Sequence, residues 1–111
     1  MSVPFSQFAD VQIVVGTIRE VSVVPEADRL LKLLVDVGED KPRQIISGIR
    51  DYVEDIETLI GVQCPFVINL EPRTIRGYES QGMILAAHHE DIFSFLSPSR
   101  DGGVPPGTPI R

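Results

Sequence analysis

The sequence predicts an all-β domain: one small five-stranded barrel, with a single short helix between the third and fourth strands and a C-terminal extension. Three observations lead to it. Most of the chain alternates apolar and polar residues with the period of two that half-buried strands show. Only the segment 54–61 changes to helical spacing. The tail, residues 99–111, is rich in glycine and proline and predicts no regular structure.

The first two strands are expected at Val11–Val24 and Arg29–Gly38. The first is rich in β-branched residues, and its alternation slips around Gly16, which predicts a bulged, strongly bent strand. The second alternates regularly and places Leu31, Leu33, Val35 and Val37 on one face. The connection between them reads as a turn, in which Asp28 is expected to bond its own backbone.

The third strand is expected at Arg43–Ile49 and the helix at Glu54–Gly61. Within that helix Ile56, Leu59 and Ile60 have i, i+3, i+4 spacing, and the final glycine suits a C-terminal cap.

The fourth strand is expected at Val62–Leu70 and the fifth at 82–87, with a sixth short piece at 91–98. Pro65 cannot donate to a ladder, so we expect it at an edge or at a position without a hydrogen bond. A five-stranded, partly open barrel with a helix in this slot is the OB-fold arrangement. We expect one domain over 1–111, with the barrel at about 8–88 and the extension at about 89–111.

Composition limits the function classes. The net charge is −6, with 16 acidic and 10 basic residues, which argues against a polyanion partner. However, six of the acids lie in two short stretches, and without them the two signs are equal in number, so the sequence allows one face to be neutral or mildly basic. Those acids are Asp51, Glu54, Asp55, Glu57, Glu90 and Asp91.

The cellular compartment is inferred from the single cysteine and from the lack of signal-peptide and membrane-spanning features in the sequence. The lone Cys64 lies in an apolar run and is expected to be a buried, inert thiol in a reducing compartment. No apolar run is long enough to cross a bilayer, and the N-terminus lacks signal-peptide features. We expect a cytoplasmic protein with no membrane partner.

Catalysis and metal binding find little support. The glycines around Ser80 are one residue too far apart for a nucleophile elbow, and a strand follows instead of a helix. His88 and His89 are adjacent, so on a strand they point to opposite faces. We expect no enzyme activity, no metal and no cofactor.

The segment 69–87 is better suited to nucleic acid. RNA is held by cationic groups along its backbone, together with groups that accept a base face or edge. Arg73 and Arg76 suit phosphate or stacking, Gly77 allows close backbone approach, and Tyr78 offers a stacking surface worth about 1–3 kcal/mol per base. The alternative is an ordinary connecting loop with solvated arginines.

The residues Asn69-Leu-Glu-Pro-Arg73-Thr-Ile-Arg76-Gly77-Tyr-Glu-Ser80-Gln81-Gly82-Met83 closely resemble the signature of the tRNA-binding domain family. That family includes the C-terminal appendix of methionyl-tRNA synthetase, free-standing tRNA-binding proteins, bacterial secretion-chaperone-like members and eukaryotic synthetase cofactors. Similar blocks follow in family order over about residues 8–110. They are Val15-Gly16, Pro25–Leu30, Val35–Gly38, Pro42–Ile49 and Val104–Thr108.

The resemblance implies an OB-fold that binds tRNA by shape rather than sequence, a homodimer built through the strand and tail after the barrel, and an association with an aminoacyl-tRNA synthetase. The RNA-contacting residues carried over are Asn69, Arg73, Arg76, Ser80, Gln81 and Met83, with Ser47 and Gly48 on the neighbouring strand. The expected dimer contacts are Ile92, Phe93, Phe95, Leu96, Val104, Pro105 and Pro106.

Departures from the family pattern remove positive charge. Glu71 stands where relatives usually carry lysine, Val14 and Thr17 replace basic residues, and Val24 and Glu26 alter a turn. We therefore expect weaker tRNA affinity than in basic relatives and a shallow salt dependence. Two alternatives stay open: a chaperone-like protein-interaction module that has lost useful RNA affinity, and a dimerisation appendage for a separate synthetase.

Overall fold

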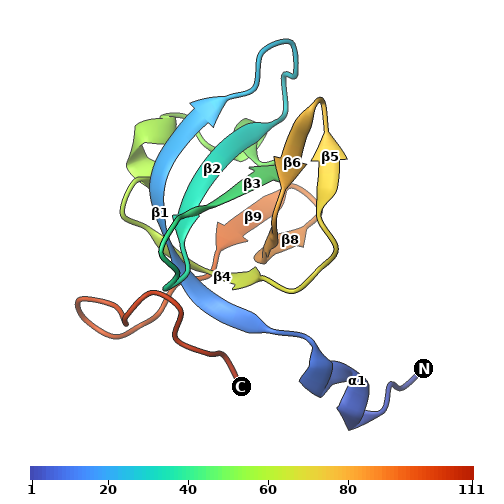
Figure 1. Ribbon diagram of the computed structural model, residues 1–111. Helices are drawn as coiled ribbons and strands as arrows, with labels where there is room; N and C mark the ends of the chain where they lie inside the picture. The colour runs from blue at the N-terminus through green and yellow to red at the C-terminus, as the bar shows by residue number, and fades with distance from the viewer.

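The computed structural model describes all residues, 1–111. Its centre is an antiparallel sheet of five strands in the order β3-β2-β1-β4-β7, curled into a barrel (Figure 1). The end strands approach each other where the backbone N–H of Gln81 donates to the carbonyl of Gln44 at 2.8 Å. The predicted five-stranded barrel is confirmed. Its strands are β1 Ile13–Val23, β2 Leu31–Asp36, β3 Arg43–Ser47, β4 Gln63–Val67 and β7 Met83–Ile84.

Two hairpins are added to the barrel: β5 Arg73–Ile75 with β6 Tyr78–Ser80, and β8 Ala86–His89 with β9 Ile92–Phe95. The fifth strand predicted over 82–87 is confirmed only for β7, Met83–Ile84, and its predicted extension to residue 87 was wrong. The N–H of Leu85 still bonds to the barrel at the Pro65 carbonyl, but the chain then leaves β4 and pairs with β9. The sixth short piece expected at 91–98 corresponds to β9.

Strand β1 serves both sides of the barrel, because its first half pairs with β4 and its second half with β2. The predicted bulge lies between Ile18 and Glu20 rather than beside Gly16. Gly16 is required instead by the close packing of β1 against the core. A Cβ there would lie 2.6 Å from Val35 Cγ1 and 2.7 Å from Phe66 Cδ2, so only bare backbone fits over the core.

The predicted helix is not an α-helix. The connection from β3 to β4 contains two short 3₁₀ helices, η1 Arg50–Tyr52 and η2 Ile56–Leu59. Leu59 is buried but Ile60 is 47% exposed, so the apolar stripe that would hold two α-helical turns against the barrel is absent. Gly61 ends the segment at a φ of 90°, as expected of a C-terminal glycine.

The core confirms the strand faces read from the sequence. All four apolar positions predicted to share a face of β2 are buried. Cys64 is fully buried, and that burial raises the pKa of its thiol to about 11, so it stays protonated and unreactive. Pro65 lies opposite Val15, whose N–H and carbonyl bond to Thr108 and Gly107 of the tail, so the missing N–H of the proline is not needed there.

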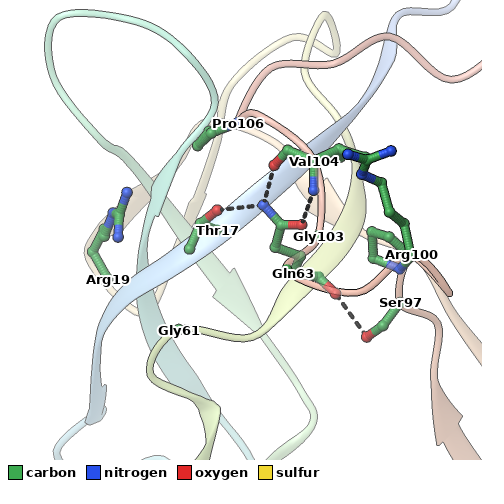
Figure 2. Close-up of a pocket in the computed structure, with 11 residues that line it drawn as sticks. Thr17, Arg19, Gly61, Gln63, Ser97, Arg100, Gly103, Val104 and Pro106 are labelled. Carbon is green, nitrogen blue, oxygen red and sulfur yellow. Dashed lines mark hydrogen bonds between the residues drawn. The ribbon is translucent and has the colours of Figure 1, made fainter.

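The C-terminal tail lies against β1 and β4, and it is held there by backbone hydrogen bonds to β1 and by the side chain of Gln63 (Figure 2). Gln63 Nε2 donates to Thr17 Oγ1 at 3.0 Å and to the Val104 carbonyl at 2.6 Å. In return its Oε1 accepts the Val104 N–H at 3.0 Å. Gln63 thus satisfies both backbone groups of Val104, in a tail whose only strand-like pairing is the isolated bridge between Val14 and Pro109.

Helix α1, Phe5–Asp10, has no counterpart in the predictions, and neither do strands β5 and β6, because no strand was expected between residues 70 and 82. The helix projects away from the barrel, and none of its residues is buried (Figure 1). No helix of the structure has the length and apolar character needed to span a bilayer.

Candidate nucleic-acid interface

The β5–β6 hairpin carries the two arginines of the predicted site. Ile75 pairs with Tyr78, which leaves Arg76 and Gly77 as a two-residue turn with φ values of 52° and 84°. Positive φ at both central residues is the type I′ arrangement that matches the twist of a hairpin. Glycine suits it, but arginine does not, because a side chain in the left-handed region costs about 1–2 kcal/mol.

The hairpin is fixed on the outer surface of the barrel. Ile75 and Tyr78 pack against a small buried cluster of Val24, Ala27 and Ile46, on the β1–β2 connection and β3. The ammonium of Lys32 lies 5.5 Å from the centroid of the Tyr78 ring, within range of a cation–π contact. One face of the tyrosine, considered above as a stacking surface for a base, is therefore already in use.

Ser80 and Gln81 join the hairpin to β3. Ser80 is only 6% exposed; its Oγ accepts the Ile46 N–H at 3.0 Å and donates to the Gly82 carbonyl at 3.2 Å. Gln81 Oε1 accepts the Gln44 N–H at 3.0 Å. These polar atoms, expected from the resemblance to contact RNA, are used within the fold. Their direct RNA contacts stay a prediction.

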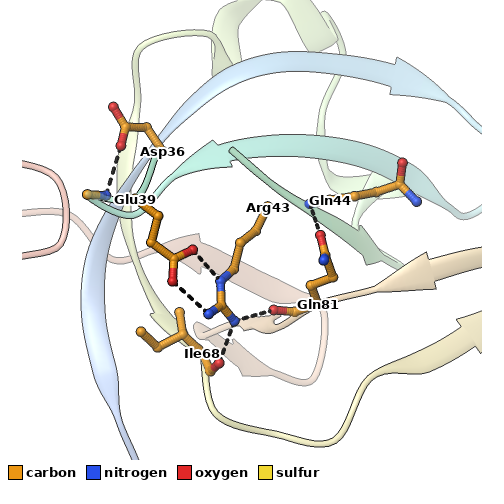
Figure 3. Close-up of polar contacts among 7 residues, drawn as sticks. Asp36, Glu39, Arg43, Gln44, Ile68 and Gln81 are labelled. Carbon is orange, nitrogen blue, oxygen red and sulfur yellow. Dashed lines mark hydrogen bonds and ion pairs between the residues drawn. The ribbon is translucent and has the colours of Figure 1, made fainter. Parts of the chain in front are cut away.

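Arg43 is the positioning residue that the sequence reasoning missed (Figure 3). Its Nε and one terminal nitrogen donate to the two carboxylate oxygens of Glu39 at 2.8 and 2.9 Å. The other terminal nitrogen donates to the carbonyls of Ile68 and Gln81, the latter at 3.0 Å. This bidentate pair lowers the pKa of Glu39. The i, i+4 spacing of opposite charges was the signal available in the sequence.

Asn69, which the resemblance predicts to contact RNA, holds the N-terminal segment. Its Oδ1 accepts the Gln12 N–H at 2.8 Å, and its Nδ2 donates to the Asp10 carbonyl at 2.6 Å. The amide thus bonds backbone on both sides of the chain between α1 and β1. An RNA contact by Asn69 therefore has to use the second N–H of Nδ2 or the second lone pair of Oδ1.

Arg73 and Arg76 are exposed and form no ion pair, unlike three other arginines of the chain. Those paired arginines are Arg19 with Asp36, Arg29 with Asp51, and Arg43 with Glu39. The remaining predicted contacts lie on neighbouring strands. Met83 on β7 is 45% exposed, and Ser47 and Gly48 end the strand on which the hairpin packs. The structure therefore presents two free guanidinium groups on one rigid hairpin.

The residues predicted for the dimer contact divide into two groups. Ile92 and Leu96 are 65% and 45% exposed, whereas Phe93 and Phe95 pack partly against the barrel core. Phe93 also stacks on the ring of Tyr52 in η1, with centroids 4.3 Å apart. In the tail, Val104 and Pro106 are half-buried and Pro105 is exposed.

Comparison with known proteins agrees with this geometry. A family model described as a putative tRNA-binding domain matches residues 13–109. The methionine–tRNA ligase of Methanosphaerula palustris is 42% identical over 109 residues, which cover 98% of this chain and 16% of the ligase.

Two solved structures share the whole fold. A MetRS-related protein from Pyrococcus horikoshii aligns with a TM-score of 0.89 and 31% identity, covering 100% of this chain and 99% of that one. The chaperone CsaA from Bacillus anthracis aligns with a TM-score of 0.86 and 26% identity over 100% of both chains. The barrel, the arginine-bearing hairpin and the family match lead to one conclusion: this chain belongs to the putative tRNA-binding domain family.

Proposed function

We propose that the chain is a non-catalytic, cytoplasmic tRNA-binding module, which holds tRNA by shape and backbone contacts through the outer face of the β5–β6 hairpin. The observation that supports this most directly is the pair of unpaired guanidinium groups at Arg73 and Arg76. A strained backbone position is retained where it serves a site, and Arg76 occupies such a position. The rigid mounting on β3 reduces the entropy that binding would cost.

Family membership and the ligase relative support a role beside an aminoacyl-tRNA synthetase of the methionyl type. In that role the module adds RNA contacts to an enzyme that carries the chemistry. Two tethered contacts can raise overall affinity without any change at either site.

The module is proposed to act as a homodimer. The six residues of α1 bury nothing, although a helix this short is not stable in water without packing. Phe5 and Phe8 in α1 are 80% and 52% exposed, and Ile92 and Leu96 in the C-terminal extension are also exposed. An apolar hollow of about 300 Å³ lies beside Leu96, between β1, β4 and the tail. A second copy would cover these surfaces and place two arginine hairpins in one particle.

Dimerisation is tested by light scattering on the full chain. Ile92→Asp combined with Leu96→Asp should yield monomers, whereas Leu70→Asp, at another exposed apolar site, should leave the mass unchanged. A wild-type monomer, or a double variant that stays dimeric, would reject the assignment.

The RNA role is tested by fluorescence anisotropy with mixed tRNA. Arg73→Ala with Arg76→Ala should weaken binding at least tenfold, because two phosphate contacts are lost. The matched control, Arg100→Ala with Arg111→Ala, removes the same charge from the tail and should bind nearly as wild type does. Thermal melts establish that both variants are folded. Unchanged binding by the first variant would reject this face.

The second candidate is the chaperone-like interaction module, favoured by the acidic surface and by Glu71 next to the arginine hairpin. It predicts no tRNA binding by the wild-type dimer, so the same titration separates the two functions.

A further inference from the structure

A groove of about 480 Å³ lies between the β1–β2 connection and the tip of the arginine hairpin. Both segments are at the same end of the barrel (Figure 1). Ala27, Leu30 and Ile75 supply its apolar lining, Arg76 lies on the hairpin side, and Glu26, Asp28 and Arg29 lie on the other. Arg29 is paired with Asp51, so the groove combines an apolar surface, one free and one paired cation, and two free carboxylates.

The two carboxylates have no partner within the protein. The N–H groups of this turn bond to backbone, Ala27 to the Val24 carbonyl and Leu30 to the Ala27 carbonyl. Asp28 was expected to bond its own backbone, and that prediction was wrong. Neither acid takes part in an ion pair, and both are exposed. Two free acceptors beside a phosphate-binding arginine would repel RNA unless the RNA donates hydrogen bonds to them.

We propose that this groove takes one unstacked guanine base of the bound RNA, a deeper inference that rests on the tRNA-binding function above. Leu30 and Ile75 contact the face of the base, and Arg76 holds an adjacent phosphate. A carboxylate of Glu26 or Asp28 accepts both N1–H and the N2 amine on the Watson–Crick edge. Ionised carboxylates are acceptors only, and unstacked bases are read on this edge in single-stranded RNA.

Guanine is favoured over the other bases because it alone has two adjacent donors on that edge. Adenine and cytosine offer one amine beside a ring-nitrogen acceptor. Uracil offers one N–H between two carbonyl oxygens, which a carboxylate repels. A bidentate pair of this kind discriminates between bases by about fivefold to a hundredfold, and an exposed groove belongs at the lower end. The module would then add one base preference to binding that is otherwise governed by shape.

The test uses RNA hairpins with a common stem, in which each loop position in turn carries guanosine, inosine or uridine. Inosine differs from guanosine only in lacking the N2 amine. At one loop position, anisotropy titrations of the wild-type chain should show guanosine binding at least about twofold tighter than inosine, which loses one of the two bonds, and at least about fivefold tighter than uridine, which loses both. Equal affinities for guanosine and inosine at every position would overturn the inference.

Two matched double variants test whether Glu26 and Asp28 cause the guanosine preference. Glu26→Gln with Asp28→Asn should abolish it while overall affinity is unchanged or rises, because two negative charges are removed. Glu54→Gln with Asp55→Asn makes the same charge change away from the groove and should keep the preference. A guanosine preference that survives in the first variant would also overturn the inference. If the wild-type chain binds neither tRNA nor any of the RNA hairpins, the proposed tRNA-binding function is rejected. This inference, which depends on that function, is then rejected as well.

Discussion

Arg76→Asn separates what Arg76 does for the fold from what it does for binding. The residue has a φ of 52° in a type I′ turn, where asparagine is preferred and arginine is strained. The strain of a side chain in the left-handed region is about 1–2 kcal/mol, and asparagine relieves part of it through local hydrogen bonding. We expect the variant to gain about 0.5–1 kcal/mol in the free energy of unfolding, which raises Tm by about 2–4 °C for a domain of this size.

Binding should change in the opposite direction. Removing one phosphate contact makes the dependence of log affinity on log salt shallower by about 0.7–0.9. The assays are thermal denaturation by circular dichroism and tRNA titrations between 50 and 200 mM salt. Arg100→Asn in the tail is the control, and it should change neither quantity appreciably. A variant that melts lower and binds tRNA as wild type does would refute both parts of the reasoning.

Three further outcomes are expected. Ser80→Ala should lower the free energy of unfolding by about 1–3 kcal/mol, because it leaves the Ile46 N–H buried without an acceptor, and an unchanged Tm would contradict this. The pKa of Glu39 is lower in the folded chain than its usual 4.5, so the folded state binds fewer protons. Stability should therefore fall as pH drops below about 4.5 in thermal melts, less steeply for Glu39→Gln. Asn69→Ala should speed amide hydrogen exchange at Gln12 but not in the barrel core, and equal protection would count against its anchoring role.

The barrel could be predicted from sequence because its strands carry a local signal. Period-two burial depends on which face of a pleat meets the core, so the buried face of β2 is readable from its own residues. The 3₁₀ segment was misread because a few apolar residues at helical spacing suit either helix type. Helix α1 has no apolar stripe of its own and gave no signal. The segment 82–87 divides between β7 and β8 because β8 pairs with β9, and β9 lies outside the segment, so the segment's own residues could not predict the division.

The sequence indicated the residues of the candidate site but not how the fold bonds their polar atoms, and their RNA contacts stay a prediction. Arg73 and Arg76 stand out as two cations three residues apart, just before Gly77, and the structure leaves both free. The polar residues around them are used by partners distant in sequence. Ser80 bonds a residue 34 positions away, and Asn69 bonds backbone 57 and 59 positions away. A residue type indicates which bonds are available but not whether the fold has already used them.

The charge around the hairpin limits how this face can hold RNA. Its nearby cations are Arg29, Lys32, Arg73 and Arg76. Arg29 is already paired with Asp51, and Lys32 lies over a tyrosine ring. If all four contacted phosphate, the slope of log affinity against log salt would reach about −3, and with the two free arginines alone it would be about −1.5. We therefore expect a slope within this range for each chain of a tRNA complex. A steeper slope, about −5 or beyond, would mean that basic residues outside the hairpin carry the binding. A slope in the expected range requires that surface shape and hydrogen bonds supply most of the affinity, because a face with so few free cations gains little from counterion release.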